Sequence, residues 1–91
     1  MPHLLSQRWH HDPGLEAIMF EAGTSEAPPE QMGIKTAALA DISKSEPSSF
    51  EAMGQLYLDN HTRIGQVTSL VLIQGRRRHR GITMLFPEDF N

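Results

Sequence analysis

The stretch QVTSLVLIQGRRRHRGITMLF, residues 66–86, decides the expected fold because a short basic segment separates two apolar ones. Residues 66–74 are rich in β-branched side chains and carry apolar residues on both alternating faces, a pattern typical of a buried strand. Residues 82–86 form a second apolar run. Five residues separate Gly75 from Gly81, which is a usual length for a hairpin connection. The stretch therefore predicts a C-terminal antiparallel β-hairpin.

The predicted hairpin would carry a basic tip, which consists of Arg76, Arg77, Arg78, His79 and Arg80. Guanidinium groups bind carboxylates and phosphates through paired hydrogen bonds, so the tip is a candidate binding site. Three interpretations remain open: a tip that is solvated or paired with the chain's own carboxylates, a contact with a partner protein, and a contact with nucleic acid. Nucleic acid is disfavoured because the net charge is −3 and no aromatic residue interrupts the arginines to stack on a base.

The charge is unevenly distributed along the chain. Residues 12–59 carry nine acidic residues against two lysines, whereas residues 60–91 carry five arginines against two acidic residues. A chain polarised in this way can complement itself within one molecule or between two copies.

The remaining segments predict a mixture of strands and helices. Residues 15–22 favour a strand, and residues 23–29 contain two prolines and favour a loop. Residues 30–42 favour a helix by their alanine content, although their period-2 pattern also fits a strand. Ser48 and Glu51 match a capping box that would begin a helix ending near residues 59–60.

Together these elements predict an α+β fold with the order β-α-α-β-β. It consists of a small antiparallel sheet of about three strands with two helices on one face. We expect residues 1–91 to form one domain, in which residues 1–14 are an N-terminal segment without a clear period. The chain has no cysteine, no basic leader followed by a long apolar run, and no apolar run long enough for a membrane span. These features predict a cytoplasmic protein that does not contact a membrane.

A single layer of helices would leave one face of the sheet uncovered. Leu72 and Met84 are candidates for that open face. Two covers are equally compatible with the sequence: the N-terminal segment folding back through Trp9, or a second molecule, which could be a partner protein or another copy in a homodimer. Because tryptophan is a frequent interface anchor, Trp9 joins the basic tip as a candidate binding residue.

The sequence contains no motif that predicts catalysis. His10, His11 and Asp12 are adjacent, but neighbouring side chains of an extended chain point to opposite faces and chelate a metal poorly. No nucleophile motif or phosphate-binding glycine loop occurs. We therefore expect a small non-catalytic interaction module, without cofactor or metal, that regulates or inhibits a partner protein. Nucleic-acid binding by the basic tip is the alternative function.

Overall fold

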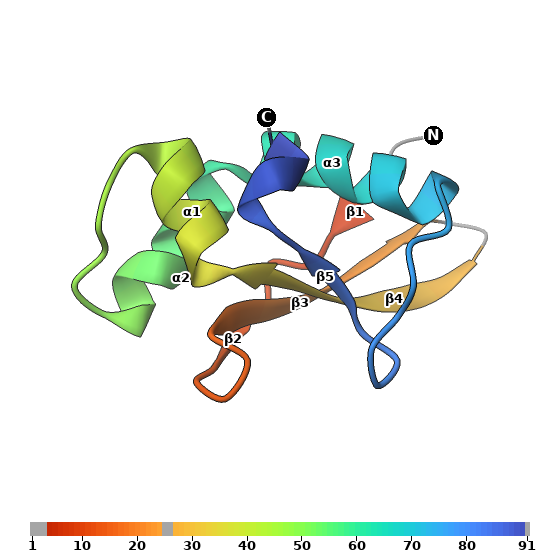
Figure 1. The fold of residues 1–91 in the computed structure, drawn as a ribbon, viewed down its shortest axis with the longest axis horizontal. Coiled ribbons are helices and arrows are strands. Elements are labelled where there is room, and N and C mark those ends of the chain that lie inside the picture. The colour runs from red at the N-terminus through yellow and green to blue at the C-terminus, as the bar shows by residue number, and fades with distance from the viewer. Residues whose placement is uncertain (1–3, 25–26, 91) are drawn as a thin grey trace.

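A computed structural model describes residues 4–24 and 27–90 of the chain (Figure 1). The described residues form a small α+β fold with a mixed five-stranded sheet and three α-helices. The elements, in order, are β1 (Leu4–Leu5), β2 (His10–Asp12), β3 (Ala17–Thr24), β4 (Ala27–Lys35), α1 (Thr36–Ser43), α2 (Phe50–Asp59), α3 (His61–Ile73), β5 (Thr83–Leu85) and the 3-10 turn η1 (Pro87–Phe90).

The hairpin of β3 and β4 forms the centre of the sheet. β1 and β2 both pair antiparallel with β3, at residues 22–23 and 17–19 respectively, so they share its outer edge. On the other side, β5 pairs in parallel with residues 32–34 of β4. A parallel pair needs a long crossover, and here the chain between β4 and β5 supplies all three α-helices.

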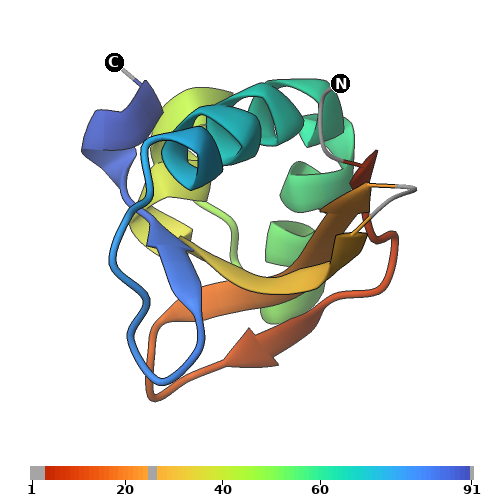
Figure 2. The same cartoon turned by 90° about the vertical axis from the view of Figure 1, so that its right-hand side faces the viewer.

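The helices cover one face of the sheet (Figure 1, Figure 2). Alternate residues of the central strands point toward them and are fully or almost fully buried: Ile18, Phe20, Ala22, Met32, Ile34 and Leu85. The helices contribute the opposing side chains, among them Leu39, Tyr57, Ile64 and Val71. The core therefore lies between the sheet and one layer of helices, as the sequence predicts.

The predicted C-terminal hairpin is wrong, because residues 66–73 belong to helix α3 and not to a strand. The buried residues Ile64, Thr68 and Val71 follow one another at helical spacing. A helix that is apolar over most of its circumference also presents apolar residues at alternate positions, so the sequence pattern fits both structures. The second arm is confirmed as β5, although its partner is β4.

Other expectations need smaller corrections. The strand predicted at residues 15–22 is confirmed as β3, displaced by two residues. Residues 30–42 divide into the second half of β4 and helix α1, so each alternative describes one part of the segment. The expected order β-α-α-β-β and the all-antiparallel sheet are wrong, since four strands precede three helices and β5 is parallel to its neighbour.

Helix α2 begins one residue later than the capping box predicts. The hydroxyl of Ser49, and not that of Ser48, accepts a hydrogen bond from the backbone N–H of Ala52 at 3.1 Å. The predicted end of this helix near residues 59–60 is confirmed.

The described part of the N-terminal segment, residues 4–14, joins the sheet through β1 and β2, and Trp9 lies between these strands. Gly54 of α2 makes room for the indole: a Cβ atom built on this glycine would lie 1.9 Å from Cζ2 of Trp9. Trp9 is half-buried and packs against the core. The tryptophan thus joins the edge of the sheet to the helix layer and does not cover the opposite face.

Two buried hydroxyls in the core should be dispensable. Among the described residues, Oγ1 of Thr68 and Oγ1 of Thr83 have no hydrogen-bond partner, although both side chains are fully buried. Valine keeps the shape and removes the unsatisfied oxygen, so each Thr→Val change should raise the free energy of unfolding by about 1 kcal/mol. Urea unfolding measures this effect, and Thr62→Val on the exposed side of α3 is the control that should change little. A loss of stability in either core variant would show that its hydroxyl is used.

Candidate functional site

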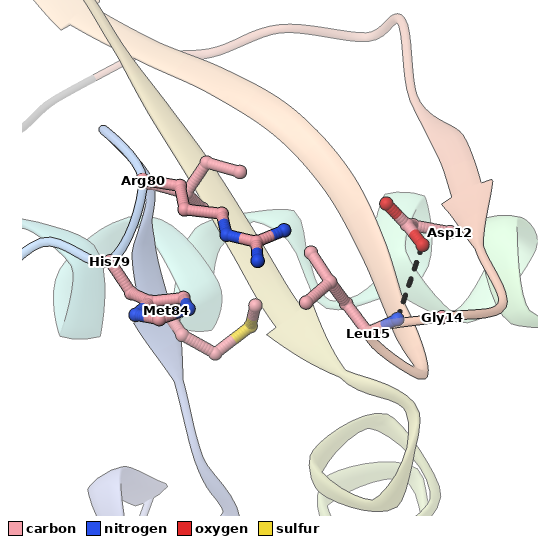
Figure 3. Close-up of a pocket in the computed structure, with 7 residues that line it drawn as sticks. Asp12, Gly14, Leu15, His79, Arg80 and Met84 are labelled. Carbon is pink, nitrogen blue, oxygen red and sulfur yellow. Dashed lines mark hydrogen bonds between the residues drawn. The ribbon is translucent and has the colours of Figure 1, made fainter.

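A groove lies on the face of the sheet that the helices leave uncovered (Figure 3). Its volume is about 350 Å³, and its lining residues are Asp12, Gly14, Leu15, His79, Arg80, Ile82 and Met84. These residues come from two segments that are distant in sequence: the end of β2 with the turn that follows it, and the turn at residues 79–82 with strand β5. β2 pairs with β3 and β5 pairs with β4, so the two segments lie on either side of the central hairpin and the groove extends between them.

The first wall of the groove is the turn between β2 and β3. Oδ1 of Asp12 accepts a hydrogen bond from the N–H of Leu15 at 3.1 Å. The carbonyl of Leu15 accepts one from Nζ of Lys35 at 2.7 Å, and the N–H of Thr36 donates to the carbonyl of Glu16 at 2.9 Å. These contacts hold the backbone of Leu15 on both sides, so its half-buried side chain is a fixed apolar surface.

The second wall is a tight turn between His79 and Ile82. Their backbones exchange two hydrogen bonds, of 2.9 and 3.0 Å. The two central residues, Arg80 and Gly81, have φ values of 54° and 77°. Positive φ at both central positions is the signature of a type I′ turn. This two-residue turn is what remains of the predicted hairpin tip.

The floor between the two walls is apolar. Met84 points away from the helices, since its neighbours in β5, Thr83 and Leu85, are the ones buried beneath them. A Cβ atom built on Gly33 would lie 3.0 Å from Sδ of Met84 and 3.1 Å from Sδ of Met19. The two thioethers therefore lie over the central strand, where the missing side chain of Gly33 leaves space for them.

The basic segment is divided between the fold and the surface. Arg76 forms a bidentate ion pair with Asp89, in which Nη1 and Nη2 each lie 2.5 Å from a carboxylate oxygen. Nη1 of Arg76 also donates to the carbonyl of Met84 at 3.2 Å. The side chains are 28% and 11% exposed, and the guanidinium lowers the pKa of Asp89 below its ordinary value. Arg76 thus fastens β5 and η1 to the end of α3.

Arg78 is paired as well, at the outer edge of β4. Its Nη2 lies 2.7 Å from each carboxylate oxygen of Glu30. This part of β4 extends beyond β5, which reaches only residues 32–34. It also contains Pro28 and Pro29, which lie in the strand and not in the loop that the sequence predicts. The ion pair holds the basic segment across this edge.

Arg77, His79 and Arg80 are exposed. Within residues 4–24 and 27–90, neither Arg77 nor Arg80 has an ion-pair partner. In Figure 3 the guanidinium of Arg80 extends from its turn toward Leu15, across the groove. Of the residues predicted to bind a partner, His79 and Arg80 line this groove, whereas Arg76, Arg78 and Trp9 make contacts within the fold.

In fold, the chain resembles a DUF1488 protein. The crystal structure of a protein of unknown function from the DUF1488 family of Shewanella loihica PV-4 superposes with a TM-score of 0.79 over 92% of this chain and 91% of that one. The two sequences are 15% identical, so the likeness concerns the fold alone. No family model matches the chain, and no curated protein matches it.

The lining of the groove combines apolar side chains with a carboxylate, a guanidinium and an imidazole. The lining residues include no hydroxyl or thiol, and the carboxylate of Asp12 accepts a hydrogen bond within its own turn. The described residues contain no group of three or more His, Cys, Asp or Glu side chains placed to hold a metal ion. No helix in the described part of the chain is long and apolar enough to cross a bilayer. What the groove offers a ligand is an apolar floor with a guanidinium and an imidazole at its rim.

Proposed function

We propose that this protein is a non-catalytic interaction module that regulates or inhibits a partner protein by binding part of it in the groove. The observation that carries the proposal is Arg80, an exposed arginine with a left-handed backbone at the rim of an apolar surface. Its charge has no ion-pair partner among the described residues.

The backbone of Arg80 supports a role in binding. At φ 54° a side chain other than glycine or asparagine costs about 1 kcal/mol. Strain of this kind concentrates at functional sites, where the surrounding structure maintains it. Here two backbone hydrogen bonds between His79 and Ile82 maintain the turn, and in Figure 3 the guanidinium of Arg80 extends over the groove.

The side chains that line the groove favour a partner with an apolar side chain next to a carboxylate. Leu15, Ile82 and Met84 would receive an apolar side chain, while Arg80 would pair with a carboxylate beside it. Arg77 lies three residues away with its own charge unpaired among the described residues, which favours an acidic partner further. A surface this small fits weak and reversible binding, with a dissociation constant on the order of micromolar.

The internal ion pairs favour a protein partner over nucleic acid. Affinity for nucleic acid depends on the number of phosphates that basic groups neutralise. Because Arg76 and Arg78 already bind Asp89 and Glu30, only two arginines of the segment are free of ion pairs with the described residues. Two positive charges form a small phosphate-binding surface.

A peptide-display selection tests the proposal. Peptides are selected against the full chain and counter-selected against Arg80→Asn, which suits the left-handed turn and removes the charge. We expect enrichment of peptides with an acidic residue next to a large apolar one. Their affinity for Arg80→Asn should be about tenfold lower, because a charge-assisted hydrogen bond is lost. The free energy of unfolding of Arg80→Asn should be unchanged or about 1 kcal/mol higher.

The matched control is Arg8→Asn, which removes an exposed arginine that does not line the groove. It should bind the selected peptides like the unaltered chain, and their NMR shift changes should map to residues 12–15 and 79–84. A selection without enrichment, or peptides that bind Arg80→Asn equally well, would refute the proposal. Anisotropy titrations of random duplex and single strands at two salt concentrations cover the alternative: salt-sensitive binding that Arg80→Asn weakens would favour nucleic acid instead.

A further inference from the structure

The methionines in the described part of the chain differ in their surroundings. Met32 is fully buried and Met19 is 6% exposed. Met53 is partly buried and packs against the core. Met84 is also partly buried, but it points away from the core and lines the groove on the uncovered face of the sheet. Among the described methionines, Met84 thus combines an outward direction with accessibility.

The pairing of the strands places this thioether. His10, Met19, Gly33 and Met84 are successive partners across β2, β3, β4 and β5. Residues that pair directly in neighbouring strands point to the same face, so these four positions form one row across the uncovered face. The glycine leaves a gap in the row, and Sδ of Met84 lies 3.0 Å from the position that a Cβ atom of Gly33 would occupy. Figure 3 shows the side chain of Met84 extending from β5 across β4, so the sulfur atom has the sheet beneath it and belongs to the floor of the groove.

We propose that Met84 is a site of oxidation by hydrogen peroxide and that its sulfoxide lowers the affinity of the groove for the partner. This regulation rests on the proposed function and concerns the same groove. In the reaction the thioether sulfur attacks one oxygen of the peroxide, the O–O bond breaks and an S–O bond forms. The hydroxide that leaves takes up the proton of the transferred hydroxyl and departs as water. The sulfur loses two electrons, the peroxide is reduced, and the product is methionine sulfoxide.

Oxidation changes the groove in two ways. A thioether contributes apolar surface to the floor, whereas a sulfoxide is polar and its oxygen accepts hydrogen bonds. The strands β4 and β5 beneath it already pair with each other, so we expect the oxygen to find its donor among the side chains of the groove. Arg80 lines the groove with Met84 and has no ion-pair partner among the described residues. A hydrogen bond from Arg80 to the sulfoxide would occupy the guanidinium that the carboxylate of the partner needs.

The fold should tolerate this change. Oxidation of a core methionine such as Met32 would place a polar oxygen among buried apolar side chains, which destabilises a protein. Met84 lies on the face without helices, and its neighbours Thr83 and Leu85 are the buried residues of β5. The thermal midpoint of the chain oxidised at Met84 should therefore stay within about 3 °C of the unoxidised one. Oxidation thus alters the surface of the groove without unfolding the protein.

Dilute hydrogen peroxide added to the full chain tests the site directly. Mass spectrometry of proteolytic fragments should show one added oxygen on Met84 about five times sooner than on the other described methionines, since access governs the rate. In NMR spectra the side-chain Nε–H signal of Arg80 should shift on oxidation, while that of Arg8, an exposed arginine outside this groove, should not. Equal oxidation of all these methionines, or an unchanged Arg80 signal, would overturn the inference whether or not a partner peptide is found.

The affinity for the selected peptides tests the effect on binding. Oxidation should lower the affinity of the unaltered chain about tenfold, and Met84→Gln, which places an uncharged polar side chain of similar length in the floor, should do the same. Met84→Leu keeps the floor apolar and lacks the thioether, so peroxide should leave its affinity unchanged. The matched control is Met53→Leu, which should lose affinity on oxidation like the unaltered chain.

Two results separate this regulation from the proposed function. An oxidised chain that binds the peptides as tightly as before would refute the regulation and leave the proposed function standing. Peptides that fail to bind even the unoxidised chain would refute the proposed function and the regulation together, while the oxidation of Met84 and its contact with Arg80 are decided by the mass spectra and the NMR signal.

Discussion

Gly54→Ala should destabilise the protein by about 2 kcal/mol, although alanine is the better helix former by about 1 kcal/mol. The reason is the indole of Trp9. A Cβ atom on residue 54 would lie 1.9, 2.2 and 2.3 Å from three atoms of the ring, so the ring must move. Displacing it separates the segment between β1 and β2 from helix α2. The cost of overpacking therefore exceeds the gain in helix propensity.

Urea unfolding of four chains resolves this effect: the unaltered chain, Gly54→Ala, Trp9→Ala and the double variant. Trp9→Ala alone should lose about 3 kcal/mol of packing. In the double variant the clash is absent, so Gly54→Ala should be neutral or slightly stabilising in the Trp9→Ala background. The exposed neighbour Gln55→Ala serves as the control for helix propensity. A Gly54→Ala chain as stable as the unaltered one would contradict this account of Trp9.

Asp89→Asn should lower the free energy of unfolding at neutral pH by about 2 to 3 kcal/mol. The carboxylate accepts both hydrogen bonds of the Arg76 guanidinium and a third, of 2.7 Å, from the N–H of Phe86. Asparagine has nearly the same side-chain volume as aspartate but cannot accept both hydrogen bonds from the guanidinium. The largely covered charge of Arg76 is then left without its counterion. The neighbouring exposed acid gives the control, since Glu88→Gln should change stability little.

The same ion pair predicts how stability depends on acid. The guanidinium of Arg76 lowers the pKa of Asp89 in the folded state, while the unfolded value is about 3.9. The stabilisation is therefore complete above about pH 4 and is lost as the pH falls through the folded value. Unfolding titrations between about pH 2 and 7 should show a smaller acid-dependent loss in Asp89→Asn than in the unaltered chain. Parallel curves for the two chains would mean that Asp89 does not contribute to the acid response.

The sequence identifies the class of the fold but not its topology. The α+β class, the strand near residues 17–24 and the helix from Phe50 to Asp59 all follow from local patterns. Residues 66–73 mislead because Val67, Val71 and Ile73 are β-branched, which is a weak preference that tertiary packing overrides. Their burial against the sheet at helical spacing depends on where β3 and β4 lie, and no local pattern contains that information.

The candidate site shows the same division. The turn at Asp12, Pro13 and Gly14 is recognisable in the sequence, and so is the basic segment. The groove that they frame is not, because it requires β5 to lie beside β4. Nor does the sequence distinguish Arg76 from Arg80, although one binds Asp89 in the fold and the other lines the groove. That distinction arises from the turn at residues 79–82.

The outer edge of β4 has a consequence for the behaviour of the protein at high concentration. Successive backbone N–H groups point to opposite edges of a strand, so one of Pro28 and Pro29 removes a donor from this edge. Arg78, bound to Glu30, places a charged side chain across the same edge. We therefore expect this edge to disfavour pairing with a strand of another molecule, which is one route to fibrillar aggregation.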